Sequence, residues 1–374
     1  ALGTRHTTEE VLMPARSLIV LAGLMLATLS PLEAQVSRAG APDSLLALLS
    51  RLDQEKRFHG VVLLAENGRV IHHSAHGLAH QGYQVPNRPD TKFNLGSVGK
   101  TFTAVAIGQL VEQGKLRFSD TLIRVVPDYP NPAIARRVTI AQLLSHRSGM
   151  GLYWDALFKG NWTAVRSISD LVPYFANDSL EFDPGSKWFY SNTGFAVLAL
   201  VVEKVSGEDY FTYVKRHIFQ PLGMNDTDSY SLDVDVPNIA VGYYRDQQGT
   251  LKNNLFTHTV RGSGAGGGFS TAPDLLKWAE GLMANRVLGA SIADRMLRQQ
   301  TDTDGGPGGY GYGFIVQQRE GQTVLGHSGG FPGIATFFWF NPANRRVAIA
   351  MSNQPGPELR QIGELLQRYL TAAD

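Results

Sequence analysis

Apolar positions keep helical spacing at both ends of the chain. After Pro42-Asp43-Ser44, five leucines between positions 45 and 52 follow this spacing, and residues 357–370 show a second amphipathic pattern. Residues 60–66 and 69–77 are predicted strands, and the Asn67-Gly68 turn between them favours a β-hairpin.

The apolar pattern between these ends predicts helices first and strands later. Pro, Gly and Asn separate the candidate helices at 140–145, 169–176, 194–205 and 210–218, and strands follow at 311–318, 323–326, 334–340 and 346–351. A sheet completed by both ends of the chain, with helices inserted between them, indicates an α+β fold.

The segment before the first helix is predicted to be a cleaved secretory signal. Met13 to Arg16 form a short positive start, residues 18–29 are largely apolar, and residues 30–34 end in a cleavage region. A membrane span needs about 20 apolar residues, so we expect no stable span after cleavage. Residues 1–12 do not fit a signal, and we interpret them as an upstream extension with Met13 as the start.

Composition narrows the classes of function. Of 374 residues, 43% are hydrophobic and 18% are charged, and the net charge of +1 lacks the basic excess of a nucleic-acid-binding protein. The chain has no cysteine, which excludes disulfides, a thiol nucleophile and a lipid-modified cysteine. With the signal, these features predict a periplasmic or secreted bacterial enzyme.

The stretch from Phe93 to Val111 holds the strongest candidate for chemistry. Its polar start runs into an apolar-periodic segment, which predicts a helix beginning near Ser97. On a helix, Ser97 and Lys100 are neighbours on one face, and the helix N-terminus favours negative charge at the Ser97 hydroxyl. A serine nucleophile beside a lysine base would have this arrangement.

Ser-x-x-Lys alone also has simpler interpretations. A Ser near a helix start is usually a cap, and a Lys one turn later is usually solvated. Gly99-Lys100-Thr101 matches the end of a phosphate-binding loop, but that motif needs Gly where Asn94 stands and a buried strand before it.

Two distant triplets favour the serine–lysine interpretation. Tyr190-Ser191-Asn192 stands at a loop-to-helix junction, and His327-Ser328-Gly329 lies between apolar, strand-like runs. The three motifs in this order resemble those of the serine β-lactamase and penicillin-binding protein superfamily. Tyr in the second motif, together with residues 143–150 and 266–274, is similar to its class C branch of β-lactamases, D-alanyl-D-alanine carboxypeptidases and family VIII carboxylesterases.

The resemblance covers residues 44–371 and implies a β-lactamase/transpeptidase-like fold. An antiparallel sheet flanked by terminal helices would form one lobe from residues 41–125 and 262–374. Residues 126–261 would form an all-helical lobe, with the active site between the two lobes.

The resemblance also implies roles for individual residues. Ser97 is the expected nucleophile and Lys100 its proton acceptor. Tyr190 would share the proton transfer, provided that a nearby ammonium lowers its pKa. Asn192 would orient Lys100 and contact the substrate carbonyl side, and Tyr153 with Trp154 would form an apolar wall unless they only pack the helical lobe.

The third motif is expected to contact substrate through His327, Ser328, Gly329 and Gly330. The N–H groups of Ser97 and Gly330 would form the oxyanion hole, and the two glycines would let substrate approach closely. The same stretch also matches the Gly-x-Ser-x-Gly elbow of α/β-hydrolases, with Ser328 as nucleophile. That fold needs a later His, and none follows Ser328.

His327 departs from the class C β-lactamase pattern, which has Lys at this position. Lys can hold the carboxylate of penicillins and stem peptides, whereas His is mostly neutral at pH 7. We expect His327 to bind a substrate carboxylate only when protonated, and His327→Lys to favour β-lactams. The departure favours simple esters and leaves D,D-peptidases open, because some of these carry His here.

The sequence therefore predicts a secreted serine hydrolase that acts through an acyl-enzyme, most directly on small esters. The alternatives are a D-alanyl-D-alanine carboxypeptidase or D-amino-acid amidase, a weak class C-like β-lactamase, and a penicillin-binding or scaffold protein without turnover. We expect a small-molecule ester, amide or β-lactam substrate, no cofactor and no nucleic acid. We expect no metal either, because His72 and His73 point to opposite faces of a predicted strand.

Overall fold

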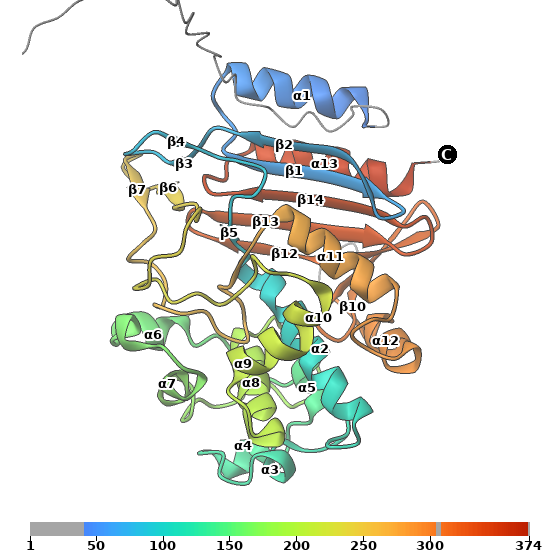
Figure 1. Ribbon diagram of the computed structural model, residues 1–374. Coiled ribbons are helices and arrows are strands. Elements are labelled where there is room, and N and C mark those ends of the chain that lie inside the picture. Colours follow the sequence, from blue (N-terminus) through green and yellow to red (C-terminus); the bar gives the residue numbers. More distant parts are fainter. Residues whose placement is uncertain (1–40, 304–307, 373–374) are drawn as a thin grey trace, which may run out of the picture. The chain divides into compact units, whose positions relative to one another are not determined.

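Strands from both ends of the chain form one sheet in the computed structural model, which describes residues 41–303 and 308–372 (Figure 1). The strand order is β2-β1-β14-β13-β12-β11-β10-β9, and every neighbouring pair is antiparallel. The predicted α+β fold, with an antiparallel sheet and flanking terminal helices, is confirmed. The predicted extension and signal at 1–34 lie outside the described residues.

Strands β1, β2, β13 and β14 match their predicted positions closely, β11 and β12 are shifted or longer, and β9 and β10 have no predicted counterpart. Their bounds are β1 (Gly60–Glu66), β2 (Arg69–His76), β9 (Thr301–Asp302), β10 (Gly308–Tyr310), β11 (Ile315–Arg319), β12 (Gln322–Phe331), β13 (Ile334–Asn341) and β14 (Arg346–Ser352). Asn67 and Gly68 both have positive φ, at 51° and 76°, as the predicted tight hairpin turn requires.

Both faces of the sheet are buried, because alternate residues of its central strands enter two different cores. Val61 and Leu63 of β1 join the core that contains α2 (Gly99–Glu112) and α11 (Ala272–Met283). Val62 and Leu64 join the core formed by the terminal helices α1 (Asp43–Gln54) and α13 (Glu358–Thr371). This explains why β1 is apolar at nearly every position.

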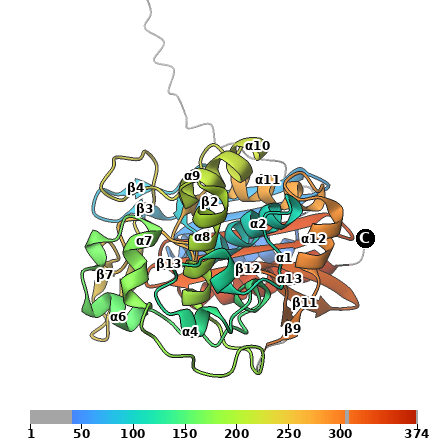
Figure 2. The same cartoon turned by 90° about the horizontal axis from the view of Figure 1, so that it is seen from below.

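Helix α2 is the buried element that carries the candidate nucleophile. It follows the 3₁₀ turn η1 (Gly96–Val98) and packs against α8 (Asn192–Ser206), and both helices lie in front of the sheet in Figure 2. Twelve of its fourteen residues are buried, which makes it a core helix with no solvent face of its own.

The remaining helices are short. They are α3 (Leu122–Val125), α4 (Pro132–Ala135), α5 (Ile140–Leu144), α6 (Trp154–Lys159), η2 (Trp162–Ala164), α7 (Ile168–Leu171), η3 (Val172–Tyr174), α9 (Tyr210–Val214), the π-helical turn η4 (Lys215–Phe219), α10 (Gln220–Leu222) and α12 (Ala290–Leu297). Helices α3, α5, α7 and α9 contact α8, whereas α12 contacts α2 and α10 contacts α11. Three small sheets pair β3 (Leu78–His80) with β4 (Val85–Pro86), β5 (Phe93–Asn94) with β8 (Phe269–Ser270), and β6 (Tyr243–Arg245) with β7 (Leu251–Asn253).

Several local predictions differ from the structure. The lobe expected to be all-helical at 126–261 contains the β6–β7 pair, and the helix expected at 210–218 is divided into α9 and the π-helical turn η4. The helix expected at 169–176 is divided into α7 and η3, because Pro173 cannot continue the helical hydrogen bonds. Helices α11 and α12 were not predicted from periodicity. Strand β12 is longer than expected and contains the whole His327-Ser328-Gly329 motif. Within the described ranges, no helix is both long and apolar enough to span a membrane.

Replacing Thr101 with Val tests how α2 is fixed. Trp278 of α11 donates its indole N–H to Thr101 Oγ1 at 3.1 Å, and both side chains are buried. Thr101→Val leaves that N–H unpaired, so we expect a loss of about 1–3 kcal/mol in the free energy of unfolding. Urea unfolding measures it. Thr323→Val on the exposed side of β12 is the matched control and should cost less than about 0.5 kcal/mol. Equal losses would contradict this role of Thr101.

Candidate active site

Ser97 lies in the turn η1, which glycine-rich segments hold on two sides. The N–H of Leu95 donates to Gly268 O at 2.8 Å, and the N–H of Gly267 donates to Gly96 O at 3.3 Å. Gly266 has a φ of +134°, and a Cβ there would lie 2.1 Å from Gly96 O. Only glycine allows this close approach, which fixes the backbone that carries Ser97.

Lys100 is fully buried directly beneath Ser97. Its Nζ lies 3.2 Å from Ser97 Oγ, 2.7 Å from Asn192 Oδ1 and 2.6 Å from Ala265 O. The amine also lies 4.9 Å from the centre of the Tyr190 ring. Burial lowers the pKa of Lys100 well below its usual value.

These three contacts fit a neutral amine. The Ala265 carbonyl and Asn192 Oδ1 can only accept hydrogen bonds, so two N–H groups of Lys100 satisfy them. In the third contact Nζ donates to Ser97 Oγ, and once the amine is neutral its lone pair can instead accept the proton of the Ser97 hydroxyl. The geometry thus matches a serine that can give its proton to Lys100.

Tyr190 and Asn192 reach this centre from the start of α8. Ser191 caps that helix, because its Oγ accepts from the N–H of Gly194 at 2.8 Å. The Tyr190 side chain hydrogen-bonds Ser97, but burial dominates and raises the pKa of Tyr190 above its ordinary value. The expected lowering of this pKa is therefore wrong: the phenol keeps its proton, because a buried phenolate would lose its hydration.

His146 is a buried partner of the second motif for which the sequence analysis proposed no role. Its Nδ1 accepts the N–H of Ser191 at 3.0 Å, and its ring centre lies 4.3 Å from that of Tyr190. Burial lowers the pKa of His146 well below its usual value, and the charge of Lys100 adds to this effect. The ring is therefore neutral with its proton on Nε2, a buried atom without a hydrogen-bond partner among the described residues. Similarity of residues 143–150 to a recurrent segment indicated this region, but periodicity could not assign its function.

His327 is also buried, and both of its ring nitrogens are engaged. Nδ1 donates to Ser328 O at 2.7 Å, and Nε2 accepts from the Tyr310 hydroxyl at 3.0 Å. The pKa of His327 is lowered to about 3, mainly by burial and in addition by a protonated Lys100, while the bond to Ser328 O acts in the opposite direction. With 2% of its surface exposed, the ring cannot receive a substrate carboxylate. The expectation that His327 binds one does not fit this structure.

The two glycines of the third motif serve different purposes. A Cβ on Gly329 would lie 2.0 Å from Leu95 O, so this glycine lets β12 pack against η1. A Cβ on Gly330 would meet nothing within 4 Å, so the space beside Gly330 is open to a ligand. Pairing of β12 with β11 ends at Gly326, so the edge of β12 beyond it faces η1 instead of a strand.

A pocket opens at Ser97 and brings part of the predicted site together. Asn192, Gly330, Tyr153 and Trp154 line it with Ser97. Lys100 and Tyr190 contact Ser97 from behind, whereas His327, Ser328 and Gly329 do not line the pocket. The rest of the lining consists of residues that were not predicted as site residues: Asn94, Gly96, His258, Thr259, Gly262, Ser263, Ala265, Gly266, Gly267, Phe331 and Ile334.

The aromatic wall of this pocket comes from two elements. The ring centres of Trp154 and Phe331 lie 5.4 Å apart, and Tyr153 is buried beside Trp154. The Tyr153 hydroxyl lies 3.3 Å from Ser263 Oγ, and burial raises the pKa of Tyr153 to about 12. Tyr153 and Trp154 therefore contribute both to core packing and to an uncharged pocket surface.

The pocket lining carries no formal charge. Among the described residues that line it, none is Asp, Glu, Lys or Arg. Burial lowers the pKa of His258, the one lining residue that could become a cation near neutral pH. Within the same part of the chain, no three His, Asp or Glu side chains converge as a metal site would require. His72 of β2 is buried, and burial lowers the pKa of its neighbour His73 to about 4.

Comparison with known proteins finds one matching family, together with penicillin-binding proteins and an esterase as similar proteins. A model of the family described as Beta-lactamase matches residues 45–372. A penicillin-binding protein of Bacillus subtilis (strain 168) is 30% identical over 326 residues, which cover 83% of this chain and 71% of that protein. Esterase EstB of Burkholderia gladioli is 29% identical over 326 residues, which cover 77% and 82%. The crystal structure of a penicillin-binding protein from Bacillus halodurans aligns with a TM-score of 0.79 and 28% identity, over 87% of this chain and 99% of that chain.

Exchanging His327 for Lys tests the buried position of this residue. The new amine would lose both hydrogen bonds of the imidazole and lie near Lys100, so we expect a loss of at least about 2 kcal/mol of stability. Turnover of nitrocefin and of a neutral ester should fall together. Thermal unfolding and kcat/KM for both substrates measure these effects. Ser328→Lys, on the exposed face of the same strand, is the control and should be tolerated. A selective gain for nitrocefin without loss of stability would restore the carboxylate-binding interpretation.

Proposed function

The chain belongs to the Beta-lactamase family, and on that premise we propose that it is a serine hydrolase of small neutral carboxylic esters, working through an acyl-enzyme. The uncharged lining of the Ser97 pocket supports this substrate class most directly. A penicillin or a stem peptide would place a carboxylate in a site without a cationic side chain in its wall. An ester has no such group, and the similarity to Esterase EstB agrees with this preference.

Acylation begins with the buried pair of Ser97 and Lys100. The neutral amine takes the hydroxyl proton while Ser97 Oγ forms a bond to the ester carbonyl carbon. The carbonyl oxygen becomes an oxyanion, and we assign its stabilisation to the backbone N–H groups of Ser97 and Gly330, both at the pocket surface. Asn192 holds the amine in place through the hydrogen bond at 2.7 Å.

Collapse of this intermediate requires a proton on the leaving alcohol. Tyr190 is suited to donate it, because burial keeps the phenol protonated and its side chain already bonds Ser97. Lys100 returns the serine proton to Tyr190, so the enzyme regains its starting state and the alcohol leaves neutral. Water repeats the same transfers in reverse roles to release the acid and free Ser97.

A substrate panel with two serine variants tests the proposal. The wild-type enzyme should hydrolyse p-nitrophenyl butanoate and react with a fluorophosphonate probe, with much slower turnover of nitrocefin and a D-Ala-D-Ala peptide. Ser97→Ala should abolish probe labelling and turnover, because it removes the nucleophile. Ser328→Ala should keep substantial activity, since this side chain is outside the pocket. Preferred turnover of the peptide would favour a D,D-peptidase, and stable penicillin labelling without turnover would favour a penicillin-binding protein.

The pH profile tests the protonation state of Lys100. Only the neutral amine can act as base, so kcat/KM should rise with pH as Lys100 loses its proton. Because burial lowers the pKa of Lys100, this rise should occur well below pH 10, where a solvated lysine titrates. Lys100→Arg, which keeps the charge at every accessible pH, should lower kcat/KM by about 10²–10⁴-fold.

The exposed Lys159 of α6 provides the control for this exchange. Lys159→Arg should leave both the rate and the pH profile unchanged. A rising limb near pH 10 in the wild-type enzyme, or substantial activity of Lys100→Arg, would contradict the role of Lys100 as base.

A further inference from the structure

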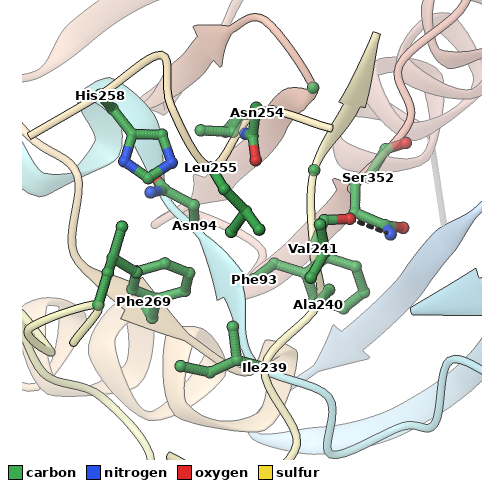
Figure 3. A pocket seen from close by; sticks show the side chains of 15 residues that line it. Phe93, Asn94, Ile239, Ala240, Val241, Asn254, Leu255, His258, Phe269 and Ser352 are labelled. Atoms are coloured by element: carbon green, nitrogen blue, oxygen red, sulfur yellow. Dashed lines mark hydrogen bonds between the residues drawn. The ribbon is translucent and has the colours of Figure 1, made fainter. Parts of the chain in front are cut away.

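A second cavity lies directly beside the Ser97 pocket and shares part of its wall. Asn94, His258 and Ile334 line both spaces. Figure 3 shows Phe93, Ile239, Leu255 and Phe269 around the cavity, with His258 beside Asn94. The proposed reaction uses none of these apolar residues.

The cavity has firm walls although surface loops build much of it. Asn254 joins two wall segments, because its N–H donates to Gly242 O at 2.9 Å and its Nδ2 donates to Pro332 O at 3.0 Å. Asn353 Nδ2 donates to Val241 O at 2.8 Å and anchors the opposite wall. A space bounded by satisfied backbone groups is preformed, so a ligand can enter without first ordering a loop.

The chemistry of the lining selects an alkyl group. The side chains around the space are mainly aliphatic or aromatic, and none of its described lining residues is Asp, Glu, Lys or Arg. Its polar side chains Asn254, Ser352 and Asn353 already bond backbone carbonyls. The volume open to the centres of water-sized groups is about 40 Å³, enough for roughly three such groups in a row.

His258 and Asn94 lie where the cavity borders the catalytic pocket, because both residues line both spaces. His258 donates its Nδ1 proton to Thr259 O at 3.2 Å, and burial lowers the pKa of His258, so the ring at this junction is neutral. A neutral His258 and the Asn94 amide allow an uncharged chain to pass, whereas a charged group would find no counter-ion there. Leu255 is 45% exposed and forms the outer side of the cavity.

We propose that this cavity is a subsite for a short alkyl chain of about three to four carbons on the ester that Ser97 attacks. The inference rests on the proposed function and adds a chain-length preference to it. The same alkyl chemistry can come from the acyl part or from the alcohol part of the ester. The two parts leave the carbonyl carbon on different sides, so only one of them reaches the cavity.

Three variants at two leucines test the subsite. Leu255→Trp fills the cavity from its exposed side, and Leu255→Ala widens it. Leu251→Trp is the matched control, because Leu251 is similarly exposed at 37% and lines neither space. One substrate arm compares p-nitrophenyl acetate with p-nitrophenyl butanoate, and the other compares ethyl acetate with butyl acetate by acid release. Thermal unfolding confirms that each variant is folded.

We expect the wild-type kcat/KM to favour the longer chain by about tenfold in one arm, as two buried methylenes would give. Leu255→Trp should remove that preference, Leu255→Ala should move it to longer chains, and Leu251→Trp should keep the wild-type ratio. The responding arm identifies the acyl or the alcohol part. No wild-type preference in either arm, or ratios that Leu255→Trp leaves unchanged, would overturn the subsite while leaving the esterase proposal intact.

Labelling rates separate the two proposals further. If the wild-type enzyme hydrolyses no ester, the proposed function fails, and butyl and ethyl fluorophosphonates that label Ser97 still report on the cavity. Faster labelling by the butyl probe, lost in Leu255→Trp and kept in Leu251→Trp, would support the subsite. Equal rates for the two probes in all three proteins would overturn it.

Discussion

The burial of one amine determines how the centre of this molecule is built. Lys100 has no contact with solvent, so its three nearest polar neighbours must be acceptors or a hydroxyl that can donate. An ammonium at this depth would need a carboxylate, and the protein supplies an amide and a peptide carbonyl instead. These neighbours come from three different elements: Ser97 from η1, Asn192 from α8, and Ala265 from the loop before β8.

The titratable side chains around Lys100 are also held in their neutral forms. His146 and His327 lie close enough for a protonated Lys100 to lower their pKa values, and because both imidazoles are neutral, Lys100 has no cationic neighbour in them. Burial keeps Tyr190 in its neutral phenol form. A site whose titratable groups are neutral at rest can move protons without collecting a net charge, which would suit the proposed ester hydrolysis, because its substrate and alcohol product are uncharged.

Local patterns in the sequence were sufficient for some of these features and insufficient for others. Ser97 and Lys100 could be paired from the sequence, because residues three positions apart on a helix lie on the same face in any tertiary fold. The fate of His327 could not be predicted, because its partner Tyr310 lies on another strand and nothing local shows which edge of β12 is covered. The second cavity depends on loops that have no apolar period, so periodicity cannot reveal it.

The pairing of β1 with β14 also affects the order in which the protein folds. These neighbouring strands are separated by most of the chain, and β12, which carries Gly330, is joined to β1 only through β13 and β14. Contacts between such distant segments form late, because closing long loops costs entropy before the sheet repays it. A chain that ends before β12 holds Ser97, Lys100 and the β5–β8 pair, but it lacks the strands β12 and β13 that contact η1. The turn that carries Ser97 therefore lacks part of its surroundings until β12 and β13 have joined the sheet.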